Sequence, residues 1–215
     1  MTRTFAALLA CLLLACASAS APSPKTPARP VVPPAALLPP SAIAFDFQWR
    51  QRVSAHWPTG KQSFDAVLQK RQGELILVGL SPLGQPGFVL RLREQGALEV
   101  ENRTGRELPF EPGYVLADVQ RVFFPWLIAL PASAASFEGE RQGQRGDSAV
   151  FERYQAGKLV ARRFERQTPA GLERVSIEYL SPPSAAQDAP ARVELDNPLL
   201  GYSLTIETLE QSRLP

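Results

Sequence analysis

The sequence predicts a mainly β fold, with about nine to eleven strands in an antiparallel sheet that curls around one short helical insert. Apolar and polar residues alternate with a period of two through most of the chain after residue 44, which is the pattern of half-buried strands. Turn residues separate these runs at short intervals, which favours a meander of sequential strands. One stretch, between Pro112 and Pro131, changes to helical spacing. We expect this insert to plug the concave side of the sheet.

The strands expected before the insert are residues 45–55, 64–68, 75–80, 88–92 and 98–100. In most of them aromatic or aliphatic residues alternate with charged or polar ones. The third run differs, because residues 75–80 are continuously apolar. Such a run predicts a strand that is covered on both faces.

The insert reads as an amphipathic helix. Its apolar residues recur at the spacing of one helix face, and they are Val115, Val119, Val122, Phe123 and Trp126. Asp118 and Arg121 fall on the opposite face. Pro112 suits the first turn of a helix, and Pro125 should kink or end it before a second short turn through Leu130.

Strands resume after the insert at residues 149–154, 159–166, 172–180, 191–195 and 202–209. Pro, Gly, Asp and Asn residues separate these runs, as expected for short turns. Glu138 and Glu140 are expected in a solvated loop before the first of them, and Arg145-Gly146-Asp147 in a turn.

The start of the chain has the pattern of an export signal. Arg3 precedes an apolar run over residues 5–15, which is shorter than the about 20 residues needed to span a bilayer. The box Leu13-Leu14-Ala15-Cys16 resembles the lipobox of bacterial lipoproteins, in which the cysteine is acylated after cleavage. The resemblance predicts a signal peptide over residues 1–15 and lipid attachment at Cys16.

Two alternatives stay open at the same place. Residues 8–11 form a competing box that ends at Cys11, although the apolar run before it is short for export. A plain signal peptide cleaved near Ala19 or Ala21 would instead release the protein into the periplasm. If Cys16 is the acylated residue, the next residue is Ala17, which is not the aspartate of the inner-membrane retention signal. By resemblance to other bacterial lipoproteins, this implies sorting to the outer membrane.

Residues 16–44 are expected to form a disordered tether to a single domain over residues 45–211. The segment is rich in alanine and serine and contains Pro22, Pro24, Pro27, Pro30, Pro33, Pro34, Pro39 and Pro40. Proline lacks the amide donor that helices and sheets require. An extended chain of this kind would hold the domain up to roughly 85 Å from its anchor.

The composition excludes several classes of function. Lys and Arg total 23 against 21 Asp and Glu, whereas a nucleic-acid-binding face needs an excess of basic residues. One histidine, with both cysteines inside the first sixteen residues, argues against a metal site, a cofactor or thiol chemistry. His56 could be posed as a base for Ser54 or Ser63, but neither serine lies in a nucleophile elbow. We therefore expect no enzymatic activity.

Several segments, taken in order, resemble the LolB family of outer-membrane lipoprotein receptors. They are residues 74–84 (ELILVGLSPLG) with the strand 88–92, residues 126–131 (WLIALP), and the closing segments 192–196 and 202–206. A family of uncharacterised bacterial lipoproteins is closer still, since it shares the Ser-Pro-Leu-Gly-Gln loop and a Gly-Tyr-Ser-Leu-Thr strand. Some of its members accompany gene sets for the assembly of polyene lipids or glycolipids.

This resemblance implies an antiparallel, incompletely closed barrel with a short helical lid over an apolar cavity for acyl chains. Apolar residues that could line the cavity, or equally pack as an ordinary core, are Phe45, Phe47, Trp49, Phe64, Leu77, Phe88, Val119, Phe123 and Trp126. It also implies a membrane-inserting loop of Pro82, Leu83 and Gly84, because the matching leucine of LolB protrudes. Expected partners are acyl chains or lipid cargo, the outer membrane and a periplasmic LolA-like carrier.

The sequence thus supports two hypotheses. In the first, an outer-membrane lipoprotein binds an acylated ligand in the half-barrel and passes it to the membrane. In the second, the same barrel is solidly packed and serves as a structural or assembly lipoprotein in an envelope complex.

Overall fold

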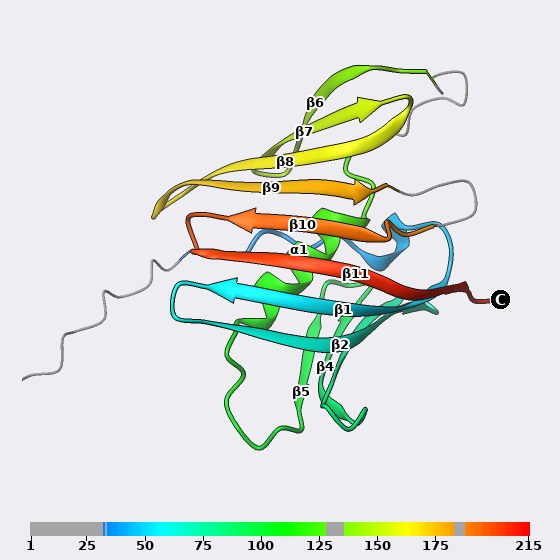
Figure 1. Ribbon diagram of the computed structural model, residues 1–215, viewed down its shortest axis with the longest axis vertical. Helices are drawn as coiled ribbons and strands as arrows, with labels where there is room; N and C mark the ends of the chain where they lie inside the picture. The colour runs from blue at the N-terminus through cyan, green and yellow to red at the C-terminus, as the bar shows by residue number, and fades with distance from the viewer. Residues whose placement is uncertain (1–31, 33, 128–135, 183–187) are drawn as a thin grey trace, which may run out of the picture.

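A computed structural model describes residue 32 and residues 34–127, 136–182 and 188–215. The expected signal peptide, Cys16 and the first half of the tether lie outside the described residues. Within them the chain forms one α-helix, one short 3-10 helix and eleven strands (Figure 1). Their bounds are η1 Pro40–Ala42, β1 Phe47–Trp57, β2 Gly60–Arg71, β3 Glu74–Leu80, β4 Pro86–Arg93, β5 Leu98–Asn102, α1 Pro112–Phe123, β6 Gly139–Arg145, β7 Ser148–Gln155, β8 Lys158–Thr168, β9 Gly171–Ser181, β10 Arg192–Asn197 and β11 Tyr202–Arg213.

All eleven strands belong to one antiparallel sheet. Its order is β5-β4-β3-β2-β1-β11-β10-β9-β8-β7-β6, so two sequential meanders meet where β1 pairs with β11. The sheet is open, because β5 and β6 are its two edges. The predicted mainly β class, meander pairing and incomplete closure are confirmed.

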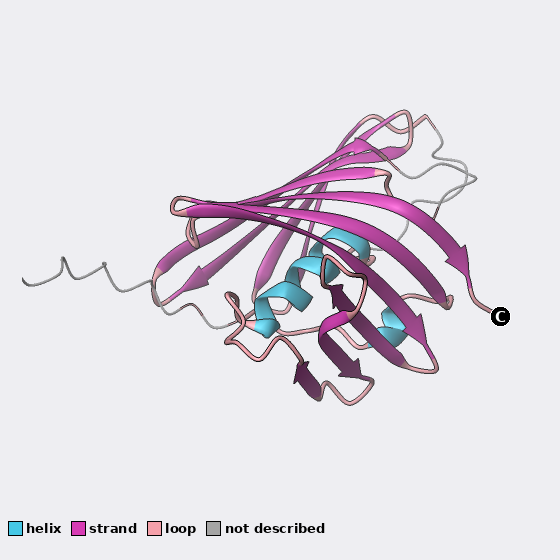
Figure 2. Ribbon diagram, turned by 60° about the horizontal axis from the view of Figure 1, so that its bottom comes forward, coloured by secondary structure: helices cyan, strands magenta, loops and turns pink. Residues whose placement is uncertain are grey.

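The sheet curls around α1, which lies on its concave side (Figure 2). The helix begins at Pro112 and ends at Phe123, with Phe124 as its C-cap before Pro125, as predicted. The further turn expected through Leu130 lies outside the described residues. None of the helices in the described ranges is long and apolar enough to cross a membrane.

The polar side of the helix is not where the sequence pattern predicts it. Asp118 and Arg121 are each only 3% exposed, whereas an amphipathic surface helix would expose them. The reason is geometric: a strongly curled sheet surrounds the helix on more than one side. Both faces of α1 therefore need a partner surface on the sheet.

The expectation that β3 is covered on both faces is wrong. Leu75, Leu77 and Gly79 are buried on the inner face, while Ile76 and Val78 on the outer face are only partly buried. The helix covers the concave side only, so the outer face of β3 stays at the surface. Gly79 is required on the inner face, because a Cβ atom there would lie 2.0 Å from the ring of Phe88 on the neighbouring strand.

Strand β6 occupies part of the region expected to be a loop. Glu140 lies in this edge strand, which contains glycines and polar residues and is mostly exposed. It pairs with β7 alone, and an exposed edge strand needs no alternation of apolar residues. The expected turn at Arg145-Gly146-Asp147 is present, with Gly146 at φ 60°.

Residues 34–44 also differ from the expected disordered tether. Leu38 is tied to the helix, since its N–H donates to Oε1 of Gln120 over 2.7 Å and its carbonyl accepts from Nε2 over 2.7 Å. Pro40 and Ile43 are buried. Prolines exclude regular hydrogen-bond ladders, but the apolar side chains between them can still pack. The packed part of the chain therefore begins before the expected boundary at residue 45.

Candidate ligand-binding face of the sheet

The concave face has two chemically different parts. The apolar half is the inner face of β1–β4, where the buried residues are apolar except for Gln51 and Lys70. The polar half is the inner face of β7–β10, where the buried residues include two arginines and two glutamates. Helix α1 lies between the two halves and contacts both.

One aromatic group of the apolar half is built around β1. Phe47 and Trp49 point to the same face and stack, with ring centroids 3.8 Å apart. Phe45 tilts against Phe47 at 5.9 Å, and Phe123 of the helix tilts against Trp49 at 5.3 Å. The stacked pair is buried while Phe45 and Phe123 are half-buried. A single aromatic layer therefore separates this pair from the surface.

A second aromatic group lies across β2, β4 and the loop before the helix. Phe88 contacts Phe64 at 5.9 Å and Phe110 at 5.1 Å, edge to face in both cases. Leu77 is buried beside them in the same core. Phe110 does not appear in the sequence prediction, because it follows a proline in a stretch without strand or helix periodicity.

The nine predicted lining residues all belong to one packed hydrophobic core, six as buried members and three packed against it. Trp126 lies toward the polar half, where its ring packs against Phe164 of β8 at 4.9 Å and its Nε1 donates to the carbonyl of Gln120. Val119 is buried in the core around the helix. Only Phe45, Phe64 and Phe123 of the nine are partly exposed, so these three mark where a ligand could first contact the apolar half.

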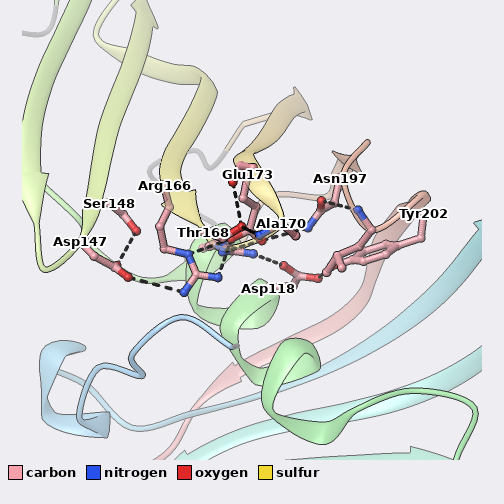
Figure 3. Close-up of polar contacts among 12 residues, drawn as sticks. Asp118, Asp147, Ser148, Arg166, Thr168, Ala170, Glu173, Asn197 and Tyr202 are labelled. Carbon is pink, nitrogen blue, oxygen red and sulfur yellow. Dashed lines mark hydrogen bonds and ion pairs between the residues drawn. The ribbon is translucent and has the colours of Figure 1, made fainter. Parts of the chain in front are cut away.

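The polar half binds the helix through a buried ion-pair network (Figure 3). Arg121 donates to Asp118 over 3.0 Å and to Glu173 over 3.2 Å. Arg166 donates to the other oxygen of Glu173 over 2.9 and 2.6 Å. Tyr202 donates to the second oxygen of Asp118. Two buried cations thus face two buried anions, so the cluster carries no net charge.

Burial governs the titration of this network. It raises the pKa of the Asp118 carboxyl above its usual value, in spite of the nearby Arg121. It also raises the pKa of Tyr202 well above 10, and the charge of Asp118 acts in the same direction. Burial alone would lower the pKa of Arg121, but Asp118 and Glu173 together raise it.

A third buried arginine caps the end of the helix. Nη1 of Arg162 donates to the carbonyls of Arg121 and Phe124 over 2.7 and 3.1 Å, while Nε and Nη2 donate to Glu152. The last carbonyls of a helix lack partners within the helix and carry partial negative charge. Tyr179 adds a bond to the carbonyl of Val122 over 2.8 Å. The polar half therefore fixes where α1 ends.

These charged residues could have been recognised from their position in the alternation. Glu173 is in phase with the buried residues Val175 and Ile177, and Arg162 is in phase with Phe164. Charged residues that take inward positions of a strand need partners inside the fold.

The Pro82-Leu83-Gly84 loop is a tight, exposed turn between β3 and β4. The N–H of Gly84 donates to Ser81 O, and the N–H of Ser81 donates to Gln85 O, both over 2.8 Å. Gly84 has φ 75°, a conformation that glycine adopts without strain. Leu83 is 86% exposed. The loop thus holds one leucine away from the domain at the end of the sheet where α1 begins.

Other chemistry finds no assembled site in the described ranges. Ser54 and Ser63 bond to each other over 2.7 Å, and Asp65 pairs with Arg50 and Arg52. No group of three or more His, Cys, Asp or Glu side chains there could hold a metal ion.

The sequence matches the family model described as Protein of unknown function (DUF3261) over residues 48–210. The chain belongs to this family. The match begins inside β1 and ends inside β11, so the DUF3261 segment includes the helix, β2 to β10 in full and most of β1 and β11. No curated protein matches the sequence.

Solved structures of similar architecture have low sequence identity to this DUF3261 chain. A LolA superfamily protein from Nitrosomonas europaea is 13% identical, with a TM-score of 0.46, over 80% of this chain and 88% of that chain. A domain described as an outer membrane lipoprotein-sorting protein, from Vibrio parahaemolyticus, is 7% identical, with a TM-score of 0.44, over 79% and 85%. A DUF1329 family protein from Desulfovibrio piger is 10% identical, with a TM-score of 0.33, over 80% and 88%. The family assignment rests on the sequence match alone.

Proposed function

We propose that this protein is a lipoprotein of the outer membrane that binds an acylated ligand on the apolar half of its concave face and passes it to the membrane. The ligand is a lipid or the acyl chains of another lipoprotein, delivered by a periplasmic carrier. Binding of this kind needs a concave apolar surface and no reactive group. Each methylene of the ligand that is buried contributes about 0.8 kcal/mol to the free energy of binding.

The observation that carries the proposal is the aromatic layer around β1 and α1. Phe45 and Phe123 are half-buried over the stacked Phe47 and Trp49. An acyl chain could take the place of Phe45 over Phe47, or of Phe123 over Trp49. It would make equivalent apolar contacts, so the exchange would cost little free energy. The exposed Leu83 supplies a membrane contact on a rigid turn, and the lipobox at Cys16 supplies an anchor.

A second candidate function is supported by the polar half. Buried ion pairs fix α1 against β8 and β9, and a helix fixed in this way suits a packed scaffold that docks a partner. Mass spectrometry of the full chain, purified under mild conditions, separates the two functions. A carrier retains lipid in a stoichiometric complex, whereas a packed scaffold carries none.

The anchor is tested by the change Cys16→Ala. We expect this variant to leave the outer-membrane fraction, because stable attachment requires two or more acyl chains. Membrane fractionation and detection of acylation by mass spectrometry provide the measurement. Acylation that persists at Cys11 would show that the lipobox is misplaced.

The loop is tested by the change Leu83→Glu. Because Leu83 makes few contacts with the domain, we expect thermal unfolding and ligand binding to stay unchanged. Delivery of a labelled lipid to liposomes should slow by about tenfold, since a charged side chain cannot enter the acyl region cheaply. Leu83→Ala is the milder comparison. Unfolding of the Leu83→Glu variant would make Leu83 a core residue, and unchanged delivery would reduce the loop to a simple turn.

A further inference from the structure

Two buried side chains of β1 carry polar atoms without a hydrogen-bond partner. Nε1 of Trp49 and Nε2 of Gln51 lack an acceptor, although each residue is only 2% exposed. Folded proteins rarely leave a buried donor unpaired, because the donor loses its bonds to water on burial. Two such donors on one strand need an explanation.

They differ from other buried side-chain nitrogens of the described residues that lack a hydrogen bond. Nε of Arg91 lies in an ion pair with Glu74, and Nε of Arg163 lies in an ion pair with Glu165. Nε1 of Trp49 and Nε2 of Gln51 are neutral donors, so no ion pair compensates for the missing hydrogen-bond acceptor. The two donors are also two residues apart, and they point to the same face of the strand.

The residues around the two donors offer few hydrogen-bond acceptors. Gln51 pairs across the sheet with Ala66 on one side and Thr208 on the other. The Thr208 hydroxyl donates to the carbonyl of Pro190 over 2.7 Å and accepts no hydrogen bond from Nε2 of Gln51. Trp49 lies between the rings of Phe47 and Phe123. The donors therefore face an apolar region that a molecule with its own acceptor could enter.

We propose that Trp49 and Gln51 bind the carbonyl oxygen of an acyl ester, while the apolar half binds its chain. This inference rests on the proposed function and names the class of ligand and its orientation, with the ester against β1. Two neutral donors in an apolar setting suit a neutral carbonyl oxygen.

A free carboxylate is a poor fit at this site. Burying it would require a cation, because an unpaired buried charge is very costly. The buried cations of the concave face are already paired with carboxylates: Lys70 with Asp46, Arg121 with Asp118 and Glu173, Arg162 with Glu152, and Arg166 with Glu173. The ligand is therefore an esterified lipid and not a free fatty acid.

The test compares three probes on the full chain by displacement of an apolar fluorescent dye. Methyl palmitate and octadecane match in length but differ in the ester, and palmitate carries a charge. We expect methyl palmitate to bind about tenfold more tightly than octadecane, as one or two added hydrogen bonds allow, and more tightly than palmitate at pH 7.

Gln51→Leu should lower the ratio of methyl palmitate to octadecane affinity without weakening octadecane binding. Trp49→Phe keeps an aromatic ring but removes the second donor, so it should lower the same ratio and provides the test if Gln51→Leu fails to fold. Gln48→Leu is the matched control, because Gln48 is exposed on the opposite face of the same strand. Gln51→Leu should also raise the melting temperature of the ligand-free protein, since it removes an unpaired donor.

Three results would contradict the ester site. Equal affinity for methyl palmitate and octadecane, unaffected by Gln51→Leu, overturns the ester site and leaves the proposed function standing. Tighter binding of palmitate than of its ester overturns the preference for a neutral carbonyl. No binding of any probe overturns both the site and the proposed function.

Discussion

The two halves of the concave face hold the same helix by different forces. On the apolar half, Phe123 of α1 packs against Trp49, and such contacts depend on area and shape with little directional preference. On the polar half, Arg121 of the same helix bonds to Glu173, and Arg162 caps its last turn. These contacts depend on angle and distance.

The difference indicates which half can accept a ligand. Apolar contacts can be exchanged for those of an acyl chain with little change in free energy. A buried ion pair cannot be exchanged in this way, because each charge that loses its partner remains in a poorly solvating environment. The polar half therefore positions α1, and the proposed function assigns ligand binding to the apolar half.

The largest effect is expected in the polar half. Glu173→Ala leaves Arg121 and Arg166 buried without their shared carboxylate, so the free energy of unfolding should fall by about 3 to 5 kcal/mol. Urea denaturation of the variant and the unmodified protein measures this loss. The control is Glu178→Ala on the opposite face of β9, where the side chain is 53% exposed and pairs with Arg153, and it should cost less than about 1 kcal/mol. If Glu173→Ala and Glu178→Ala lower the free energy of unfolding equally, the ion-pair network does not hold the helix.

The next effect belongs to the apolar half. Phe123→Asp should abolish binding of an apolar dye or a fatty acyl probe, because it places a charge on the binding surface, while circular dichroism shows a folded protein. Phe151→Asp, on the outer face of β7, is the control and should keep binding.

A contrary result in the apolar half would favour a packed core. In that case Phe123→Ala would lower the free energy of unfolding by about 3 to 5 kcal/mol, as for an emptied aromatic site, and no acyl probe would bind to the unmodified protein.

The smallest effect is a dependence on alkaline pH that arises in the polar half. Burial raises the pKa of Tyr154 to about 12 and raises that of Tyr202 well above 10. Since the folded pKa exceeds the unfolded one, the stabilising contribution is complete below pH 10 and is lost as pH rises toward the folded value. Urea denaturation at about pH 8 and pH 11 should show this loss, and Tyr202→Phe should make it smaller. If Tyr202→Phe loses as much stability between pH 8 and pH 11 as the unmodified protein, the loss does not arise from Tyr202.

The sequence predicts the strands well because each has a buried and an exposed face. β4 follows the alternation from end to end, and β1 follows it from Phe47 to Arg52. Strand β6 has no apolar alternation and so gives no such signal. The packed segment before β1 was hidden by its prolines, although Leu37, Leu38 and Ile43 could have marked it as apolar.

The candidate site is less predictable from sequence. The positions of Phe45, Phe47 and Trp49 on one face follow from alternation alone, but their contact with Phe123 depends on where α1 lies. That position is set by Arg121 and Glu173, which are 52 residues apart and show no local pattern that joins them. Sequence periodicity assigns Arg121 to the exposed face of the helix and Glu173 to the inner face of its strand, but only the curled sheet brings the two together.

The pairing of β1 with β11 has a consequence for the time course of folding. Arg50 and Glu210 meet across the centre of the sheet although they are 160 residues apart in the sequence. At synthesis rates of about 5 to 20 residues per second, on the order of 10 s or more separate the appearance of the two strands. During that interval β1 presents an unpaired edge and an aromatic inner face, which are the features that promote aggregation. In a nascent chain β1 can pair with β2 early, but its other edge stays open until β11 has emerged.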